Sequence, residues 1–316
     1  MKKLLAIGLM AAILGLSGCT GANSSDTGKN DNTVTFTDAL GREVSVPKNP
    51  ERTAALIGSF ADVWALSGGT LCAAPEDAWD DFDLELPEAV NLGGAHSPGF
   101  EALLSSDPDF VIASASTAAD VDMKEQLENI GITVAYFDVD NFDDYLEMLD
   151  ICTDITGRKD LYEQNGLNVK KEIEEIKADF NNADIPEDKR TVLLLRASAG
   201  FIKAKNSEGT ILGEMLSDLG CINIADSDKS LLEDLSVESV IRNEPYHIFV
   251  VTMGDDTEKA LSNLNRMMEE NAAWGTLSAV KNNRLNVMDR KLFNIKPNAK
   301  WAEAYEKLSR ILSEKE

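Results

Sequence analysis

Short apolar runs alternate along this chain with longer stretches in which apolar residues recur at helical spacing. The runs rich in β-branched and other apolar residues predict strands at 54–57, 110–113, 133–137, 192–195, 248–251 and 284–288. Before them, residues 34–36 and 44–46 flank a turn that contains Gly41 and predict a β-hairpin. Strands that alternate with helices form mainly parallel sheets covered on both faces. The pattern therefore predicts an α/β protein.

A long amphipathic stretch separates two sets of these strands. Within residues 160–182, the side chains that recur on one helical face are Tyr162, Val169, Ile173, Ile176 and Phe180. About 23 helical residues span roughly 35 Å, which is enough to cross between two domains. We therefore expect two Rossmann-like lobes, 33–158 and 183–316, joined by one long rigid helix at 159–182.

The two halves also contain related segments. Residues 100–112 and 237–249 align without a gap, at an offset of 237 − 100 = 137 residues. Each segment has a glutamate, Glu101 or Glu238, that opens a short helix, then an acidic residue and a proline, and then an apolar strand. Proline ends such a helix because its ring clashes with helical continuation and biases the preceding residue towards extended geometry. The repeat supports two lobes of common architecture.

The N-terminus has the order of a secretory signal, with Lys2 and Lys3, then an apolar run, then small residues before Cys19. The apolar run is shorter than the ~20 residues that span a bilayer, and Leu16-Ser17-Gly18-Cys19 resembles the bacterial lipobox. We expect removal of residues 1–18, lipid attachment at Cys19, and an extracytoplasmic protein anchored to the bacterial cell membrane. An uncleaved anchor helix is the alternative. Residues 19–32 are mostly small and polar, which is typical of a flexible tether.

Composition narrows the function. Lys and Arg total 30 against 55 Asp and Glu, and the formal charge of −25 repels nucleic acid in the absence of a segregated basic patch. Two histidines supply poorly the ligand cluster that a bare zinc or manganese ion needs. The chain has no Gly-x-Ser-x-Gly elbow, no phosphate-cradling Gly-rich signature and no paired His-x-x-x-His. We therefore expect no enzyme and no cofactor, and a monomer.

Three cysteines follow Cys19 in the chain. Cys72, Cys152 and Cys221 are odd in number and lie in apolar local patterns. This favours three buried free thiols, with a Cys72–Cys152 disulfide as the alternative.

Five ordered motifs resemble the class III substrate-binding proteins of ABC importers, which carry iron-siderophores, haem and cobalamin. The motifs are residues 38–52, residues 100–112, residues 236–240, residues 274–285 and residues 296–303. The resemblance covers nearly all of the mature chain and implies an ABC permease and its ATPase as partners. It also implies that Glu101 and Glu238 dock on arginines of the two permease subunits through charge-assisted contacts. The plainer interpretation of both glutamates is favourable charge near a helix N-terminus.

In such a fold the ligand lies between the lobes, near the carboxyl ends of the strands. The candidate ligand-binding residues in the loops there are Phe60, Trp79 and His96 in the first lobe and Arg196, Phe201, Lys203, Lys205, Met253 and Phe293 in the second. Aromatic and Met side chains suit a bulky ligand, and the cations suit carboxylates or catecholates of an anionic chelate. Each candidate residue also has a plainer interpretation. Arg196 can be a cation at a strand end, His96 a solvated loop residue, and the apolar side chains part of the core.

These observations favour a ferric siderophore or a similar metal chelate as the ligand. Cobalamin or another corrinoid, and haem, are alternatives, and haem would take His96 as its axial ligand. We expect His247 to be structural, because it begins a buried strand. A different class of function on the same fold is an adhesion or signalling lipoprotein.

Overall fold

The computed structural model describes residues 32–254 and 256–313. The expected signal peptide, Cys19 and nearly all of the expected tether lie outside the described residues. None of the helices in the described ranges is both long and apolar enough to cross a membrane.

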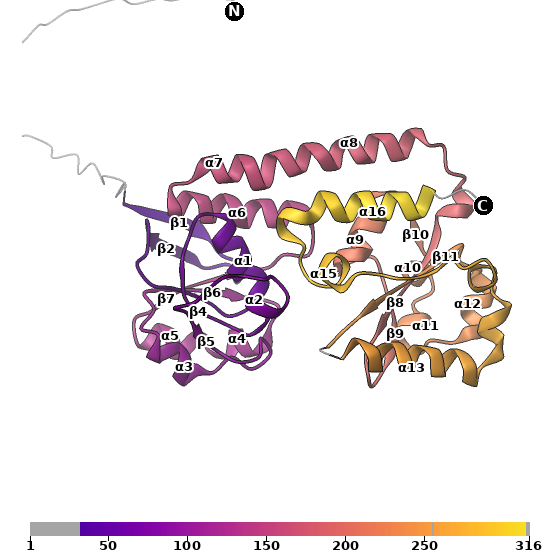
Figure 1. Ribbon diagram of the computed structural model, residues 1–316, viewed down its shortest axis with the longest axis horizontal. Helices are drawn as coiled ribbons and strands as arrows, with labels where there is room; N and C mark the ends of the chain where they lie inside the picture. The colour runs from indigo at the N-terminus through magenta and orange to yellow at the C-terminus, as the bar shows by residue number, and fades with distance from the viewer. Residues whose placement is uncertain (1–31, 255, 314–316) are drawn as a thin grey trace, which may run out of the picture. The chain divides into compact units, whose positions relative to one another are not determined.

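The first lobe contains a β-hairpin and a parallel sheet (Figure 1). The hairpin strands β1 (Thr33–Thr37) and β2 (Glu43–Pro47) pair antiparallel across the predicted turn. The sheet has the order β5-β4-β3-β6-β7, and all of its pairs are parallel. Its strands are β3 (Thr53–Ala55), β4 (Leu71–Ala74), β5 (Val90–Asn91), β6 (Phe110–Ser114) and β7 (Thr133–Phe137).

Six helices connect and cover these strands. They are α1 (Gly58–Leu66), α2 (Asp77–Asp80), α3 (Phe100–Ser105), α4 (Ala118–Asp122), α5 (Lys124–Asn129) and α6 (Phe142–Thr156). Helix α6 begins at a capping box, in which the Asn141 side chain accepts from the Asp144 amide and the Asp144 carboxylate accepts from the Asn141 amide. It ends at Gly157, which takes the left-handed conformation that favours glycine at this position.

The second lobe contains a five-stranded sheet. Its strands are β8 (Thr191–Ala197), β9 (Ile202–Lys205), β10 (Ile222–Asn223), β11 (His247–Thr252) and β12 (Leu285–Val287). The order β10-β8-β11-β12 is parallel, and β9 pairs antiparallel with the second half of β8. The sequence therefore predicts the mainly parallel sheets correctly but misses the short strands β4, β5, β9 and β10.

The described part of the second lobe contains eight helices. They are α9 (Ile211–Asp218), α10 (Ile224–Ser227), α11 (Ser230–Glu233), α12 (Val237–Asn243), α13 (Thr257–Glu270), α14 (Ser278–Lys281), α15 (Arg290–Phe293) and α16 (Trp301–Ser313). Three 3-10 turns complete this half, at Glu187–Arg190, Ala272–Thr276 and Asn298–Lys300.

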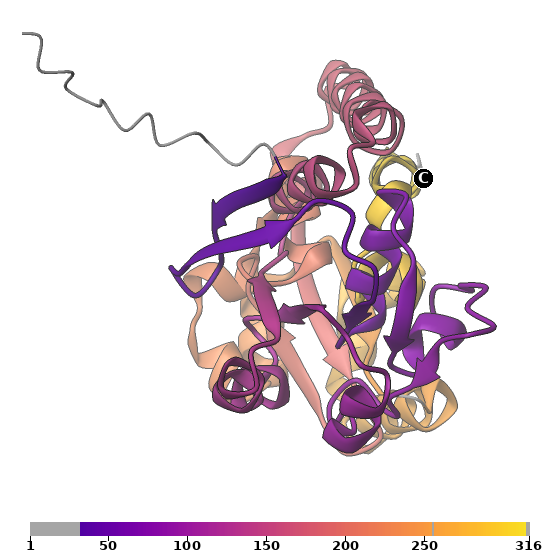
Figure 2. The ribbon, with the colours of Figure 1, turned by 90° about the vertical axis from the view of Figure 1, so that its left-hand side faces the viewer.

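The helix between the lobes is interrupted, whereas the periodicity predicts one continuous helix. It consists of α7 (Lys159–Tyr162), a π-helical turn at Glu163–Leu167 and α8 (Asn168–Asn182). Gly166 lies in the π-helical turn, and a Cβ there would meet the Leu146 side chain of α6 at 3.0 Å. The close approach of α6 therefore explains the glycine within the π-helical turn. Helix α8 lies beside α16 (Figures 1 and 2).

The structure supports the internal repeat at the level of single residues. Helix α3 precedes the central strand β6, and α12 precedes the central strand β11. Asp107 and Glu244, which are 137 residues apart (244 − 107), both have left-handed backbones, with φ of 47° and 39°. Such a conformation is uncommon outside glycine, so its recurrence at equivalent positions is informative. The short helix, the left-handed acidic residue, the proline and the strand form one unit used twice.

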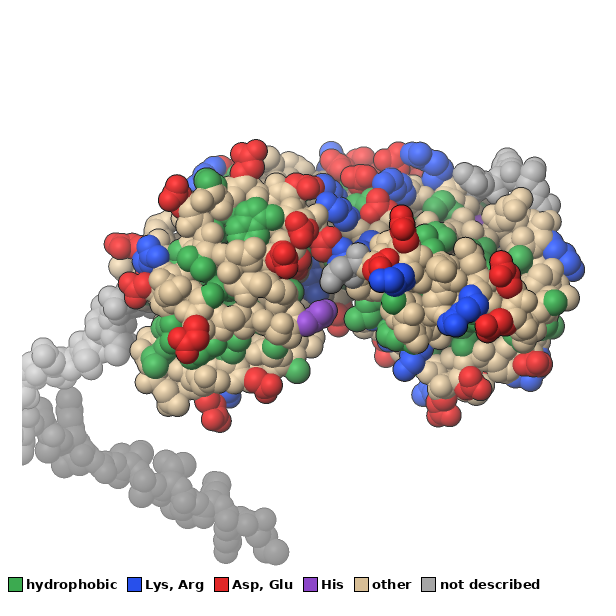
Figure 3. All heavy atoms as spheres, turned by 60° about the horizontal axis from the view of Figure 1, so that its bottom comes forward, with side chains coloured by type: hydrophobic (Ala, Val, Ile, Leu, Met, Phe, Trp, Pro, Cys, Tyr) green, Lys and Arg blue, Asp and Glu red, His purple; other side chains and the backbone are tan. Residues whose placement is uncertain are grey.

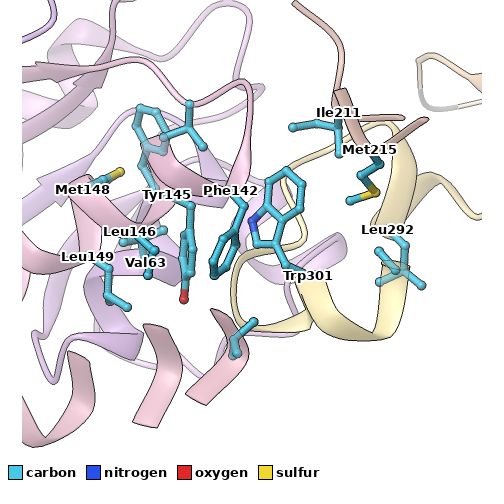
Figure 4. Packing of buried hydrophobic residues seen from close by; sticks show 14 of the residues in the cluster. Val63, Phe142, Tyr145, Leu146, Met148, Leu149, Ile211, Met215, Leu292 and Trp301 are labelled. Carbon is cyan, nitrogen blue, oxygen red and sulfur yellow. The ribbon is translucent and has the colours of Figure 1, made fainter. Parts of the chain in front are cut away.

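One apolar core joins the two lobes. It includes Ala55 and Ile112 from the first sheet, and Leu194 and Phe249 from the second. Near its centre the rings of Phe142, at the start of α6, and Trp301, at the start of α16, meet edge to face at 5.9 Å (Figure 4). The C-terminal helix therefore packs on both lobes.

All three described cysteines are free thiols, and the Cys72–Cys152 alternative is wrong. Only Cys152 is fully buried, whereas Cys72 and Cys221 are half-buried. Burial raises the pKa of the Cys221 thiol to about 12, so this thiol stays protonated at neutral pH.

Candidate functional site

A hollow separates the two lobes, and Figure 3 shows basic side chains inside it. In an open α/β sheet the binding crevice lies beyond the carboxyl ends of the strands. Strand β8 of the second lobe ends at Ala197, immediately after Arg196. This arginine is the starting point of the candidate ligand site.

Arg196 continues the face of β8 that belongs to the core shared by the lobes. Alternate residues of a strand share one face, and Val192 and Leu194 of this face pack in that core. Arg196 is half-buried, and its Nε is fully enclosed with no hydrogen-bond partner. Burial lowers the pKa of the Arg196 guanidinium. The side chain is therefore a half-buried cation whose Nε has no hydrogen-bond partner.

Two lysines of β9 share this face of the sheet. Lys203 lies directly opposite Arg196 in the antiparallel register, and Lys205 lies opposite Leu194. Burial lowers the pKa of the Lys205 ammonium, and the charges of Arg196 and Lys203 lower it further. No carboxylate of the described residues forms an ion pair with any of the three cations. Their arrangement suits an anion that carries several oxygen atoms.

A further half-buried lysine, which the sequence interpretation missed, lies against Phe60 of the first lobe. Lys296 lies in the segment between α15 and α16, with its Nζ 5.7 Å from the centre of the Phe60 ring. Burial lowers its pKa, while the nearby carboxylates of Asp140 and Asp138 act in the opposite direction. In the sequence, Lys296 is marked only by its place in the motif at residues 296–303. That motif identifies the family and does not identify a binding site.

The segment from Arg290 to Asn298 fastens the second half of the chain to the first lobe, and we call it the clasp. Arg290 forms an ion pair with Asp81. The Lys291 Nζ donates to the Asp80 carbonyl at 3.2 Å and lies 3.3 Å from the Asp83 carboxylate.

The far end of the clasp is also anchored. The Asn298 amide nitrogen donates to the Ser59 carbonyl and to the Asp62 carboxylate, both at 2.8 Å. These contacts link the elements that border the hollow to each other.

Two aromatic side chains expected to contact ligand are buried instead. Phe60 is 0% exposed and packs edge to face on Phe137, and Phe293 is 2% exposed in the same core. The sequence places both in loops after strands, but Phe60 lies in α1 and Phe293 ends α15, and each side chain packs in the core that the lobes share. Both expectations are therefore wrong.

The remaining candidates keep some exposure. Trp79 and Met253 are half-buried, whereas His96 and Phe201 are exposed. Among the described residues, one ring contact joins two of the candidates. The Lys203 Nζ lies 5.6 Å from the centre of the Phe201 ring. The structure thus places the basic residues and Phe201 together on the second lobe. It does not join His96 to them.

The other histidine is structural, as expected. His247 is 5% exposed and stacks on Phe249 at 5.5 Å. Burial lowers its pKa to about 4, and the Arg284 charge adds to this effect, so the ring is neutral at pH 7. Within the described ranges, no group of three or more His, Cys, Asp or Glu residues is arranged to hold a metal ion.

Glu101 and Glu238 occupy equivalent places in the repeat. Each is exposed and lies in the first turn of its helix, α3 or α12. The backbone amide of Glu238 itself lowers the pKa of this carboxyl group, as does the Ser236 hydroxyl, which donates to the carboxylate at 3.0 Å. Both carboxylates are available at the surface of their lobes.

The comparisons with known proteins agree with this architecture. The family model described as "Periplasmic binding protein" matches residues 54–292. The chain belongs to this family, the class III substrate-binding components of ABC importers. Members of this family are transport components rather than enzymes.

Individual relatives are distant. The chain is 25% identical, over 96% of its length and 96% of the relative, to a protein named "Putative ABC transporter substrate-binding lipoprotein YhfQ" of Bacillus subtilis. Its fold matches the siderophore-binding protein BauB with a TM-score of 0.70 and 17% identity, covering 90% of this chain and 99% of BauB. It also matches SirA of Staphylococcus aureus in complex with staphyloferrin B, with a TM-score of 0.65 and 19% identity, over 88% and 96% of the two chains. Haem- and vitamin B12-binding proteins match in fold as well.

Proposed function

We propose that this protein captures a ferric siderophore or a similar anionic metal chelate between its two lobes and delivers it to an ABC permease. The observation that carries the proposal is that half-buried Arg196 shares one face of the sheet with Lys203 and Lys205, and that none of the three has an ion-pair partner among the described residues. Three cations on one sheet face repel each other in the ligand-free protein. An anionic ligand would remove that repulsion.

The chemistry of the three side chains matches such a ligand. A guanidinium offers planar, paired donors to carboxylate or catecholate oxygens, and lysines add mobile point charges. A partly enclosed cation has already lost part of its hydration, so each contact to an anion is stronger than it would be on an open surface. A neutral corrinoid would leave the three charges without partners. This disfavours cobalamin.

Haem is the second candidate, because its propionates are also anionic. It requires an axial ligand, and His96 is the histidine whose side chain is exposed. A Soret shift upon titration with haemin that disappears in His96→Ala would favour this candidate over the siderophore.

The same proposal covers anchoring and delivery. Cys19 would carry the lipid, and labelling with a fatty acid should mark the wild type but not Cys19→Ala. Glu101 and Glu238 would dock on the permease. Equal labelling of the two proteins would overturn the anchoring claim without affecting the ligand.

The test of the ligand is quenching of intrinsic tryptophan fluorescence by a panel of ferric siderophores, cobalamin and haemin. Half-buried Trp79 follows β4 and provides a reporter in the first lobe. We expect saturable quenching by at least one anionic ferric siderophore and none by cobalamin. Saturation by cobalamin alone would contradict the proposal.

A further inference from the structure

A groove on the second lobe lies apart from the cationic face. It has a volume of about 390 Å³ and is bordered by the β8–β9 turn, α11 and α13. Leu195 and Ala197 of β8 pack in one core with Leu231 of α11, whereas Arg196 lies on the other face of the strand. The groove is therefore not part of the ligand site proposed above.

The floor of the groove is apolar and partly open to solvent. Ile202, Leu232, Leu235 and Met267 are half-buried side chains that line the groove and pack against the core of the second lobe. Phe201 also lines the groove and is 39% exposed. Apolar side chains that gather at one place on a surface mark an interaction site.

The rim of the groove is acidic. Glu233, Asp234 and Glu270 line the groove and are exposed. None of the three forms an ion pair within the described part of the chain. Unpaired carboxylates around an apolar floor are complementary to an apolar side chain that has basic residues beside it.

The groove is continuous with the surface around Glu238. Leu235 lines the groove and precedes Glu238 by 238 − 235 = 3 residues, so at most about 11 Å of chain separates them. Helix α11 leads into α12, and the 3-10 turn at Ala272–Thr276 contacts both α12 and α13. A partner segment that places an arginine on Glu238 therefore has the groove within reach of the residues next to that arginine.

We propose that the groove receives an apolar side chain of the permease segment whose arginine binds Glu238. The occupant is thus a basic extracytoplasmic segment of the permease that carries an apolar residue near its arginine. Exposed ion pairs contribute little affinity, whereas apolar side chains seated in pockets contribute much of it. The inference rests on the proposed function, because it requires docking through Glu238.

Photocrosslinking in whole cells tests the occupant directly. Glu233→p-benzoylphenylalanine places a photoreactive group at the rim of the groove, and irradiation should link the protein to its permease, identified by mass spectrometry. Glu303→p-benzoylphenylalanine on α16 replaces another exposed glutamate and should give no such link. A link from position 233 to a second copy of this chain, or no link to the permease above the control, would overturn the inference.

Uptake tests the contribution of the apolar floor. Leu232→Asn and Met267→Gln, which are close in size to the native residues, should each lower the initial rate of radioactive iron uptake by whole cells roughly 5-fold. The iron is supplied as the ferric siderophore that binds tightest in the panel, and affinity for it should not change. Glu233→Lys alters only an exposed rim charge and should also lower uptake, so the test does not depend on tolerance of the floor variants.

Controls separate this inference from the proposed function. Leu167→Asn removes a leucine that is 42% exposed in the π-helical turn, on the opposite side of the molecule from α13, and should leave uptake normal (Figures 1 and 2). If the groove variants take up iron normally while Glu238→Arg does not, docking stands and the inference fails. If all of these variants are normal, both fail. The crosslink at position 233 requires no ligand, so it decides the inference even if no siderophore binds.

Discussion

Arg196 and Lys203 lie directly opposite each other in the antiparallel β8–β9 pair, so two cations share one face of the sheet. Like charges in this position destabilise a sheet. The guanidinium is half-buried and has no carboxylate partner among the described residues, so the ligand-free fold bears this repulsion unrelieved. The arrangement is understandable if a ligand supplies the missing anion.

This relationship predicts opposite effects of one substitution on stability and on binding. Arg196→Gln should raise the free energy of unfolding of the ligand-free protein by about 0.5–1 kcal/mol, because it removes one of the facing charges. Chemical denaturation at low salt measures this. Arg242→Gln, which removes a cation paired with Asp228, is the control and should give no increase. A less stable Arg196→Gln protein would contradict the account.

The clasp makes a separate prediction about stability. Arg290→Ala should lower the free energy of unfolding by roughly 1–3 kcal/mol, because the pair with Asp81 is mostly shielded from water and its loss leaves Asp81 without its cation. Arg310→Ala breaks an exposed pair with Glu306 four residues earlier and should cost only about 0.3–0.5 kcal/mol. Equal losses in the two variants, measured by urea denaturation, would show that the clasp does not hold the lobes together.

Asp120 predicts a pH dependence. Its side chain is fully buried, with Oδ2 accepting from the Ser114 amide and Oδ1 without a partner. Burial raises its pKa to about 7, and the charge of Asp77 adds to the rise. The folded protein therefore retains a proton between pH 4 and 7 that the unfolded chain releases, so this group makes stability fall as pH rises through that window.

The measurement is the difference in unfolding free energy between the wild type and Asp120→Asn at pH 4, 5.5 and 7. Asp120→Asn should be less stable overall, because its amide nitrogen has no acceptor where Oδ1 lies. Its stability should nevertheless lose the downward trend, which is at most about 1.4 kcal/mol per pH unit for one proton. Parallel pH profiles of the two proteins would show that Asp120 is ionised in the fold.

Docking predicts a separation between binding and transport. Glu101→Arg and Glu238→Arg each replace a surface carboxylate by a cation, which turns attraction to a permease arginine into repulsion. Both residues are exposed, so ligand affinity and stability should hardly change while uptake of radioactive iron by whole cells falls. Glu303→Arg on α16 is a control for charge alone. Normal uptake by the Glu101/Glu238 double variant would defeat the docking role.

Local pattern was sufficient to predict six of the ten strands of the two five-stranded sheets, and the repeat. Buried parallel strands are continuous apolar runs, and β7 begins and ends at the residues that the pattern gives. The sequence pattern did not predict the π-helical turn. The turn is associated with the close approach of α6 to Gly166, a tertiary contact that has no signature in the spacing of apolar residues. The pattern also missed strand β9, because this strand is short and two of its residues are lysines.

The candidate site was predicted less completely, for a related reason. The sequence places Phe60 and Phe293 in loops, whereas they lie in α1 and α15. The direction of a side chain depends on what packs around it, and both pack in the core shared by the lobes. The position of Lys296 against Phe60 could not be predicted, because this contact forms only when the chain folds back on the first lobe. The sequence pattern places Arg196 directly after the apolar run at 192–195, and the structure extends β8 to Ala197, so Arg196 lies within the last two residues of the strand. Its contact with the ligand stays a prediction.

The affinity of Arg196→Ala for the ferric siderophore that binds tightest in the panel tests the central claim most directly. The account predicts that its dissociation constant, measured by fluorescence quenching at fixed ionic strength, rises roughly 10- to 150-fold, which corresponds to about 1.5–3 kcal/mol for a charge-assisted hydrogen bond. Arg242→Ala should retain the affinity of the wild type. An unchanged dissociation constant in Arg196→Ala would contradict the account, because it would show that the half-buried guanidinium does not bind the ligand.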